Sequence, residues 1–196
     1  MNKKIYGLGI NDADYTTQTR AKGEVKYWKC PFYERWTNML KRCYSQVWMN
    51  SHPTYIGCNV CEDWLRFSNF KKWMEQQNWE GKHLDKDILI KGNKTYSPKA
   101  CMFVAQEVNK LFADSGAARG NFPQGVYIDK INGKFKAQIS KRGMVIGLGY
   151  FDNKEGAENE YIKEKRGYIL EIVENLKDED PRLKPALIRI SENLTK

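Results

Sequence analysis

Residues 125–151 read GVYIDKINGKFKAQISKRGMVIGLGYF, and this stretch decides the fold of the C-terminal part of the chain. Apolar residues recur at every second position, a pattern typical of half-buried strands. The three strands that it predicts cover residues 125–131, 134–141 and 144–151. Asn132-Gly133 and Arg142-Gly143 separate them, and Asn-Gly is a strong signal for a hairpin turn. The stretch therefore predicts a three-stranded antiparallel sheet.

The same alternation assigns the two faces of the predicted sheet. Phe135, Ala137 and Ile139 are expected to face a helix over residues 154–176, which a capping sequence at residues 152–155 begins. The opposite face is polar, and its charges are almost all positive. The residues expected to bind DNA on this face are Tyr127, Lys130, Lys134, Lys136, Gln138, Lys141 and Arg142.

A twisted sheet with such a face can enter the major groove of double-stranded DNA. There, glutamine can read adenine, and lysine or arginine can read guanine. The competing interpretation is an ordinary solvated face, because charged side chains are usually exposed. The 196-residue chain has a net charge of +9, which attracts polyanions such as nucleic acid, although a merely soluble basic protein has the same balance.

Five cysteines and the lack of a secretory leader predict a protein of the reducing cytoplasm, in which cysteines are thiols or metal ligands. No run of about 18 apolar residues occurs, so no membrane partner is expected. Hydrophobic residues make up 41% of the chain, which is enough to fill a core.

The N-terminal half predicts an irregular arm over residues 1–25 and then two amphipathic helices. Pro31 can begin the first helix. Its apolar face consists of Tyr33, Trp36, Leu40 and Cys43. The second helix has an aromatic stripe, which is more typical of a core than of a cofactor site. This stripe consists of Trp64, Phe67, Phe70 and Trp73.

A strand, a loop, a second strand and a helix are expected next. Their predicted bounds are 83–91 for the first strand, 101–104 for the second and 106–112 for the helix. Residues 114–124 are small, polar and glycine-rich, which predicts a linker. A last short helix is expected over residues 181–194. The expected fold class is α+β, with a helical N-terminal region, this strand–strand–helix module, and a three-stranded sheet packed on one helix.

Part of the second half matches a known pattern over about residues 122–170. The matching residues are Gly125 to Tyr127, Gly133 to Ile139, Leu148 to Asp152, Glu155, Ala157 and Tyr161. In these residues the chain resembles the APETALA/ethylene-response-factor DNA-binding domain. The resemblance implies a three-stranded sheet that packs on one helix and docks in the major groove. Tyr127 stands where the plant proteins have arginine, so the preferred DNA sequence is open.

A second pattern extends over residues 30–112. Its residues are Trp36 to Leu40, Arg42-Cys43, Val60-Cys61, Trp64, Phe67, Phe70, Leu84 to Asp87, Gly92-Asn93, Tyr96 to Pro98, Cys101 and Asn109. This pattern resembles phage HNH homing endonucleases of the ββα-metal class. The two resemblances together imply four segments: an arm over 1–25, an HNH-like module over 26–114, a DNA-binding domain over 122–176 and a C-terminal helix over 177–196.

In the HNH class, one divalent metal ion stabilises the scissile phosphate and a histidine on the first strand activates water. The resemblance gives Asp85 and Asn109 the metal positions, where oxygen ligands suit Mg²⁺ or Mn²⁺. Lys86 stands at the position of the base, and Ala100 at that of the middle asparagine. A lysine base needs a lowered pKa, so His83 is an alternative base, and Lys86 could instead hold a phosphate.

The cysteines provide a second candidate metal site. Cys58 and Cys61 have the spacing of a zinc knuckle, although a lone pair of this kind is a weak signal. Four cysteines could converge on one structural Zn²⁺, but buried thiols are the expected state. These four are Cys30, Cys43, Cys58 and Cys101.

Two main functions remain in competition. The first is a metal-dependent DNA endonuclease or nickase of the phage homing type, active in the cytoplasm of the host cell. The second is a degenerate nuclease that has kept sequence-specific DNA binding and acts as a repressor or recruiter, since Lys86 and Ala100 depart from the motif. A third class is a protein–protein adaptor that uses exposed tyrosines and tryptophans. The sequence leaves the oligomeric state open.

Overall fold

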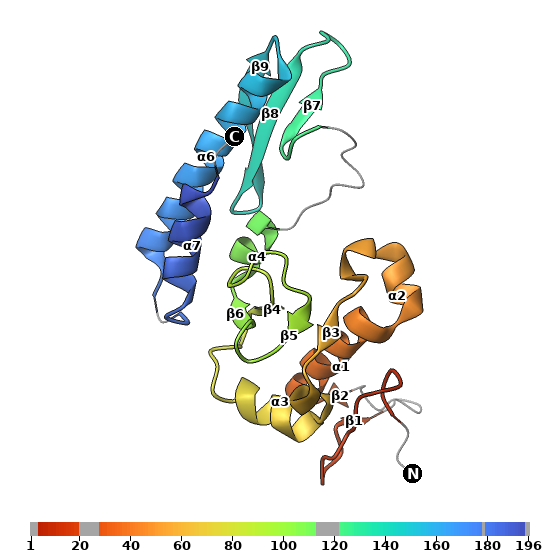
Figure 1. Ribbon diagram of the computed structural model, residues 1–196. Helices are drawn as coiled ribbons and strands as arrows, with labels where there is room; N and C mark the ends of the chain where they lie inside the picture. Colours follow the sequence, from red (N-terminus) through yellow and green to blue (C-terminus); the bar gives the residue numbers. More distant parts are fainter. Residues whose placement is uncertain (1–3, 20–27, 113–121, 178, 195–196) are drawn as a thin grey trace. The chain divides into compact units, whose positions relative to one another are not determined.

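The computed structural model describes residues 4–19, 28–112, 122–177 and 179–194. These residues form six α-helices and several small β-sheets, which confirms the α+β class. The chain divides into two compact units, residues 1–103 and 104–196 (Figure 1). Most of the predicted linker, at residues 113–121, lies outside the described residues, as do residues 20–25 of the predicted arm.

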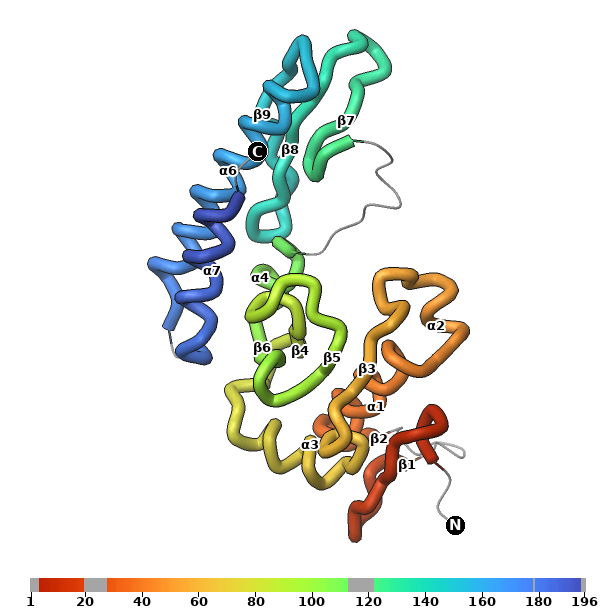
Figure 2. The backbone as a smooth tube through the Cα atoms, viewed as in Figure 1, coloured from red at the N-terminus to blue at the C-terminus, as the bar shows by residue number. Residues whose placement is uncertain are grey.

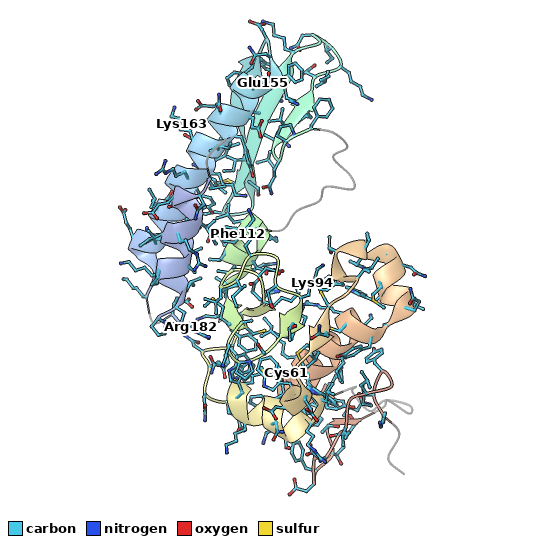
Figure 3. All side chains as sticks on the ribbon, in the orientation of Figure 1. Cys61, Lys94, Phe112, Glu155, Lys163 and Arg182 are labelled. Atoms are coloured by element: carbon cyan, nitrogen blue, oxygen red, sulfur yellow. The ribbon has the colours of Figure 1, made fainter. Side chains whose placement is uncertain are left out.

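The first unit is built from short elements. Its helices are α1 (Pro31–Tyr44), α2 (Gln46–Ser51) and α3 (Phe67–Met74), with 3₁₀ turns η1 (Pro53–Tyr55) and η2 (Glu62–Leu65). Its strands are β1 (Gln18–Thr19), β2 (Trp28–Lys29), β3 (Asn59–Val60), β4 (His83–Asp85), β5 (Thr95–Tyr96) and β6 (Met102–Val104). The last residue of β6 is the first residue of the second unit. β4 pairs with β6, and the chain between them makes a wide loop that contains β5 (Figure 2). Lys94 lies beside β5 (Figure 3) and donates to the carbonyl oxygen of Thr54 at 2.8 Å, which ties this loop to η1.

The core of the first unit is aromatic, as the two stripes predict. The whole predicted face of α1 is buried, and Trp36 is 0% exposed. Its indole Nε1 donates to the buried carbonyl oxygen of Trp64 at 2.7 Å. Trp64 itself lies in the 3₁₀ turn η2 and not in an α-helix, because Arg66 is extended (φ −92°, ψ 129°) and separates η2 from α3. The predicted second helix is therefore a 3₁₀ turn followed by a shorter α-helix.

The N-terminal arm is bonded to this core, which the expectation of an irregular arm did not include. Ile10 donates its backbone N–H to the carbonyl oxygen of Leu65 at 2.8 Å and accepts from the N–H of Phe67 at 3.0 Å. Asp12 accepts from the backbone N–H and hydroxyl of Ser68 at 2.9 and 2.7 Å. Because these N–H groups lie at the start of α3, the Asp12 carboxylate caps a helix that begins more than fifty residues later.

The second unit contains the predicted three-stranded antiparallel sheet. Its strands β7 (Val126–Ile128), β8 (Phe135–Lys141) and β9 (Met144–Phe151) pair in the order β7-β8-β9. Helix α6 (Lys154–Asn175) covers one face, and α7 (Leu183–Glu192) packs against α6 (Figure 1). Helix α4 (Gln106–Phe112) belongs to the same unit. Asn153 caps α6 by accepting from the N–H of Gly156 at 2.7 Å, one residue later than a cap at Asp152.

One irregularity interrupts the sheet. Ala137 pairs with Gly149, but Gln138 pairs with Gly147, so Leu148 is an extra residue that bulges from β9. Gly149 takes φ +124°, a conformation that favours glycine. The bulge reverses the alternation of β9: Tyr150 and Gly147 share the face of Lys136 and Gln138, although their spacing in a regular strand would place them on opposite faces.

Candidate functional site

The face of the sheet opposite α6, called the open face below, has a mixed polar and aromatic surface. The pairing places on it Tyr127, Lys136, Gln138, Ser140, Val145, Gly147 and Tyr150. The predicted inner residues Ala137 and Ile139 are buried at 0% and 3% exposure, so the assignment of the two faces of β8 is confirmed. Space above Gly147 is open, because a Cβ atom there would have no neighbour within 4 Å in the described part of the chain.

Lys136 occupies the centre of the open face. Its Nζ lies 5.8 Å from the ring centroid of Tyr127 and 5.4 Å from that of Tyr150. A hydrogen bond with Tyr127 and the nearby Tyr150 raise the pKa of Lys136, which stays charged at neutral pH. The hydroxyl of Tyr127 also donates to Oε1 of Gln138 at 3.2 Å. The two tyrosines therefore hold a cation and an amide in defined positions.

Lys141 and Arg142 lie elsewhere, so their expected place on the open face is wrong. Lys141 continues the alternation of the buried residues, and its Nζ pairs with Glu164 of α6 at 2.8 Å. Arg142 adopts φ +49° in the turn, its N–H donates to the hydroxyl of Tyr168 at 2.8 Å, and its guanidinium pairs with Glu171. Both cations are therefore neutralised by carboxylates of α6.

The two other predicted cations are exposed near the β7–β8 turn. Lys134 pairs with Asp152 at 3.0 Å, and Lys130 is exposed. Asp129 accepts from the N–H groups of Ile131 and Asn132 at 2.8 and 3.4 Å, which stabilises the turn. These backbone bonds are the main cause that lowers the pKa of Asp129. The turn begins at Asp129, which explains why β7 is shorter than predicted.

In the first unit, Asp85 ends β4. Its Oδ1 accepts from the N–H groups of Asp87 and Ile88, both at 2.8 Å, and these bonds turn the chain. The predicted strand over residues 83–91 therefore stops at Asp85. Burial raises the pKa of Asp85, against the lowering effect of the two backbone bonds. Oδ1 accepts both backbone hydrogen bonds of the turn, so Oδ2 is the oxygen with which Asp85 could coordinate a cation.

Lys86 is 6% exposed and fully engaged in hydrogen bonds. Its Nζ donates to the two carboxylate oxygens of Asp87 at 2.7 and 2.8 Å and to the carbonyl oxygen of Asn93 at 2.9 Å. Burial lowers the pKa of Lys86, but the bond and charge of Asp87 outweigh it and raise the pKa. A base needs the opposite shift, so the geometry does not fit Lys86 as a base or as a phosphate ligand. It holds the loop after β4.

The remaining residues of the predicted metal site belong to different elements of the two units. His83 is exposed at the start of β4, and Ala100 is buried. Asn109 is half-buried in α4, which belongs to the second unit, while Asp85 belongs to the first. Within the described ranges, no three His, Cys, Asp or Glu side chains form a group that could hold a metal ion. The magnesium site of Asp85 and Asn109 stays a prediction.

The cysteines are free thiols, and the four proposed as zinc ligands do not form such a group in the described part of the chain. Cys30, Cys43, Cys58 and Cys101 are all buried. Burial raises the pKa of Cys43 to about 12 and also raises that of Cys101, so both are protonated at neutral pH. Their positions in the aromatic core fit a packing role.

Positive charge is distributed unevenly between the units. Residues 1–103 contain seventeen lysines and arginines and ten acidic residues, whereas residues 104–196 contain sixteen and fourteen.

Tyr150 is the open-face residue that the sequence reasoning missed, because the bulge hides its alignment with Lys136.

No helix in the described ranges has the length and hydropathy needed to cross a membrane. Comparisons with known protein families, curated proteins and solved structures found no match for this chain.

Proposed function

We propose that the protein binds double-stranded DNA and that the open face contacts the duplex. The observation that supports this most directly is Lys136, held between Tyr127 and Tyr150 on an exposed antiparallel sheet. Among the described residues it forms no ion pair, in contrast to Lys134 and Lys141. A lysine that is held by tyrosines and forms no salt bridge can neutralise a DNA phosphate without first breaking an ion pair.

The neighbours of Lys136 suit a groove contact. Cation–π contacts at exposed sites contribute about 0.5–1 kcal/mol each, so the two rings restrict the lysine without burying it. The side chain of Gln138 is oriented by Tyr127, and a glutamine amide can pair with adenine in the major groove. The open space above Gly147 leaves room for a base edge or the sugar–phosphate backbone. The larger positive excess of residues 1–103 favours non-specific attraction by the first unit.

Replacement of Lys136 by glutamine is expected to weaken duplex binding about tenfold at low salt, which corresponds to ~1.4 kcal/mol. It should also reduce the slope of log affinity against log salt by about 0.9, because one fewer counterion is released. Fluorescence anisotropy with a labelled duplex between 50 and 200 mM salt, about the range over which such contacts weaken, measures both quantities.

Lys163→Gln is the matched control for this experiment. Lys163 is exposed on α6 (Figure 3) and lies outside the open face. It pairs with Glu160 at 3.3 Å. Equal affinity losses in the two variants would mean that only net charge matters and would contradict a role for the open face. Binding that does not depend on salt would instead favour a protein partner.

A metal-dependent endonuclease is the second candidate function. It is favoured by the order β4, loop, β6, α4, with Asp85 at the end of the first strand. If the module cleaves DNA, Asp85→Asn should reduce plasmid nicking in Mg²⁺ or Mn²⁺ by at least about 100-fold, since removing a charge that stabilises a transition state costs ~2.7 kcal/mol or more. Asparagine keeps an Oδ1 acceptor for the N–H groups of Asp87 and Ile88, so the turn survives.

Glu62→Gln provides the comparison, because Glu62 is an exposed carboxylate of the same unit and its replacement removes the same charge. Nicking by the wild type that only Asp85→Asn abolishes would support the endonuclease. Equal nicking by all three proteins would indicate a contaminating nuclease. Duplex binding without any nicking would leave DNA binding as the function and would reject cleavage.

A further inference from the structure

The first unit contains a small basic cavity that is separate from the residues of the open face. It has a volume of about 40 Å³ and lies between α1 and the start of β4. Its lining consists of Arg35, Asn38, Met39, Arg42, His83 and Leu84. The first four residues follow helical spacing along one face of α1, so two arginines and an asparagine of this helix border the same space.

The charge in this cavity lacks compensation. No acidic residue lines it, and neither Arg35 nor Arg42 forms an ion pair within the described ranges. Among the residues that the structure describes, the buried Nε of Arg35 has no hydrogen-bond partner. Burying a charged donor without an acceptor is unfavourable, so the Arg35 side chain is satisfied better when an anion accepts from it.

The other lining residues fit an oxyanion. Arg42 is held in place by a hydrogen bond with Tyr96 and by the ring of Tyr55, whose centroid lies 5.7 Å from the guanidinium carbon. Met39 and Leu84 are buried and apolar, and an apolar wall strengthens nearby electrostatic interactions. The volume is sufficient for a few water molecules or one tetrahedral oxyanion.

We propose that this cavity binds one phosphate group, with Arg35 and Arg42 as its principal ligands and Asn38 at its edge. Planar guanidinium groups match phosphate oxygens in pairs, which makes them better ligands for this group than for a spherical anion. The phosphate comes either from a nucleic-acid backbone or from a free phosphate. The proposal stands apart from the open face, because all six lining residues belong to residues 1–103.

The test observes the Arg35 Nε–H directly by ¹H–¹⁵N NMR of the full chain, with its signal assigned by its loss in Arg35→Gln. Inorganic phosphate, a short duplex and acetate are titrated separately at matched ionic strength. The Arg35 signal is expected to shift and saturate with phosphate or with the duplex, and saturation by the duplex alone would identify the nucleic-acid backbone as the source. The amide signals of Asn38 and His83 should follow in the wild type.

Arg35→Gln should weaken the saturable shift of the Asn38 amide at least about tenfold. Arg66→Gln should leave it unchanged, because Arg66 lies in the same unit but does not line the cavity. Unaltered tryptophan fluorescence verifies that each variant is folded. The proposal is overturned by a shift that never saturates, by equal saturation with acetate, or by an Arg35→Gln protein that binds phosphate as tightly as the wild type. Failure of the Lys136→Gln experiment would leave this result unaffected.

Discussion

Gly125→Ala is expected to destabilise the second unit by about 3 kcal/mol or more, from the sum of backbone strain and overpacking. Gly125 has φ +76° at the start of β7, and its carbonyl oxygen accepts from the N–H of Gln138 at 2.8 Å. A Cβ atom here would lie 2.6 Å from the carbonyl oxygen of Gln138 and would overlap the ring of Tyr161. Neither neighbour can move freely, because one is a backbone atom of β8 and the other is a buried side chain.

Gly133→Ala separates the two causes. Gly133 has φ +70° in the β7–β8 turn, but a Cβ atom there would meet nothing within 4 Å. It should cost only the backbone strain, about 1 kcal/mol. Urea unfolding followed by circular dichroism, with hydrogen exchange of peptides from 125–151, measures both variants. Similar losses in the two proteins would show that Tyr161 and β8 do not confine Gly125.

Trp36→Ala should destabilise the first unit by about 3–5 kcal/mol, because it removes a large side chain from a closely packed core. Trp36 is 0% exposed and contacts Phe67, with ring centroids 5.5 Å apart. It also packs near the N-terminal arm: a Cβ atom on Gly9 would lie 3.0 Å from two carbons of the Trp36 ring. The loss of Trp36 therefore leaves a cavity bordered by α1, α3 and the arm.

Trp36→Phe divides this loss into packing and hydrogen bonding. Phenylalanine keeps most of the packing but leaves the buried carbonyl oxygen of Trp64 without its donor, which should cost about 1–3 kcal/mol. All six tryptophans fall within residues 1–103, so their fluorescence during urea unfolding reports the first unit. A loss below about 1 kcal/mol for the alanine variant would mean that Trp36 is not a core residue.

The predictions from periodicity were the most accurate. Helical spacing identified the buried face of α1, and alternation identified all three strands of the C-terminal sheet and the inner residues Ala137 and Ile139. These patterns arise because each element is buried on one side, against a single neighbouring layer. They can therefore be recognised in the sequence of that element alone. The early end of β4 is different, because it depends on the side-chain oxygen of Asp85 binding backbone groups two and three residues later.

The misplaced cations show why the candidate site was harder to predict than the fold. The faces of Lys141 and Arg142 depend on Glu164 and Glu171, which lie 23 and 29 residues further along the chain. A signal was present, because these two glutamates share helical spacing with Tyr161 and Tyr168 on the face of α6 that packs against the sheet. For the alignment of Tyr150 with Lys136 the signal was weaker: Gly147 and Gly149 inside the strand are typical of a bulge, but they do not specify the new register.

The extra residue in β9 also affects how the sheet meets other chains. β9 is an outer strand, and its first residues Met144, Val145 and Ile146 are apolar and 40–66% exposed. Such an edge is a template for intermolecular strand addition and aggregation. A strand from another molecule could follow β9 only as far as Gly147, where the register breaks at Leu148. This interruption makes the segment of β9 that can pair with another strand shorter than the six or so residues typical of amyloid-forming segments.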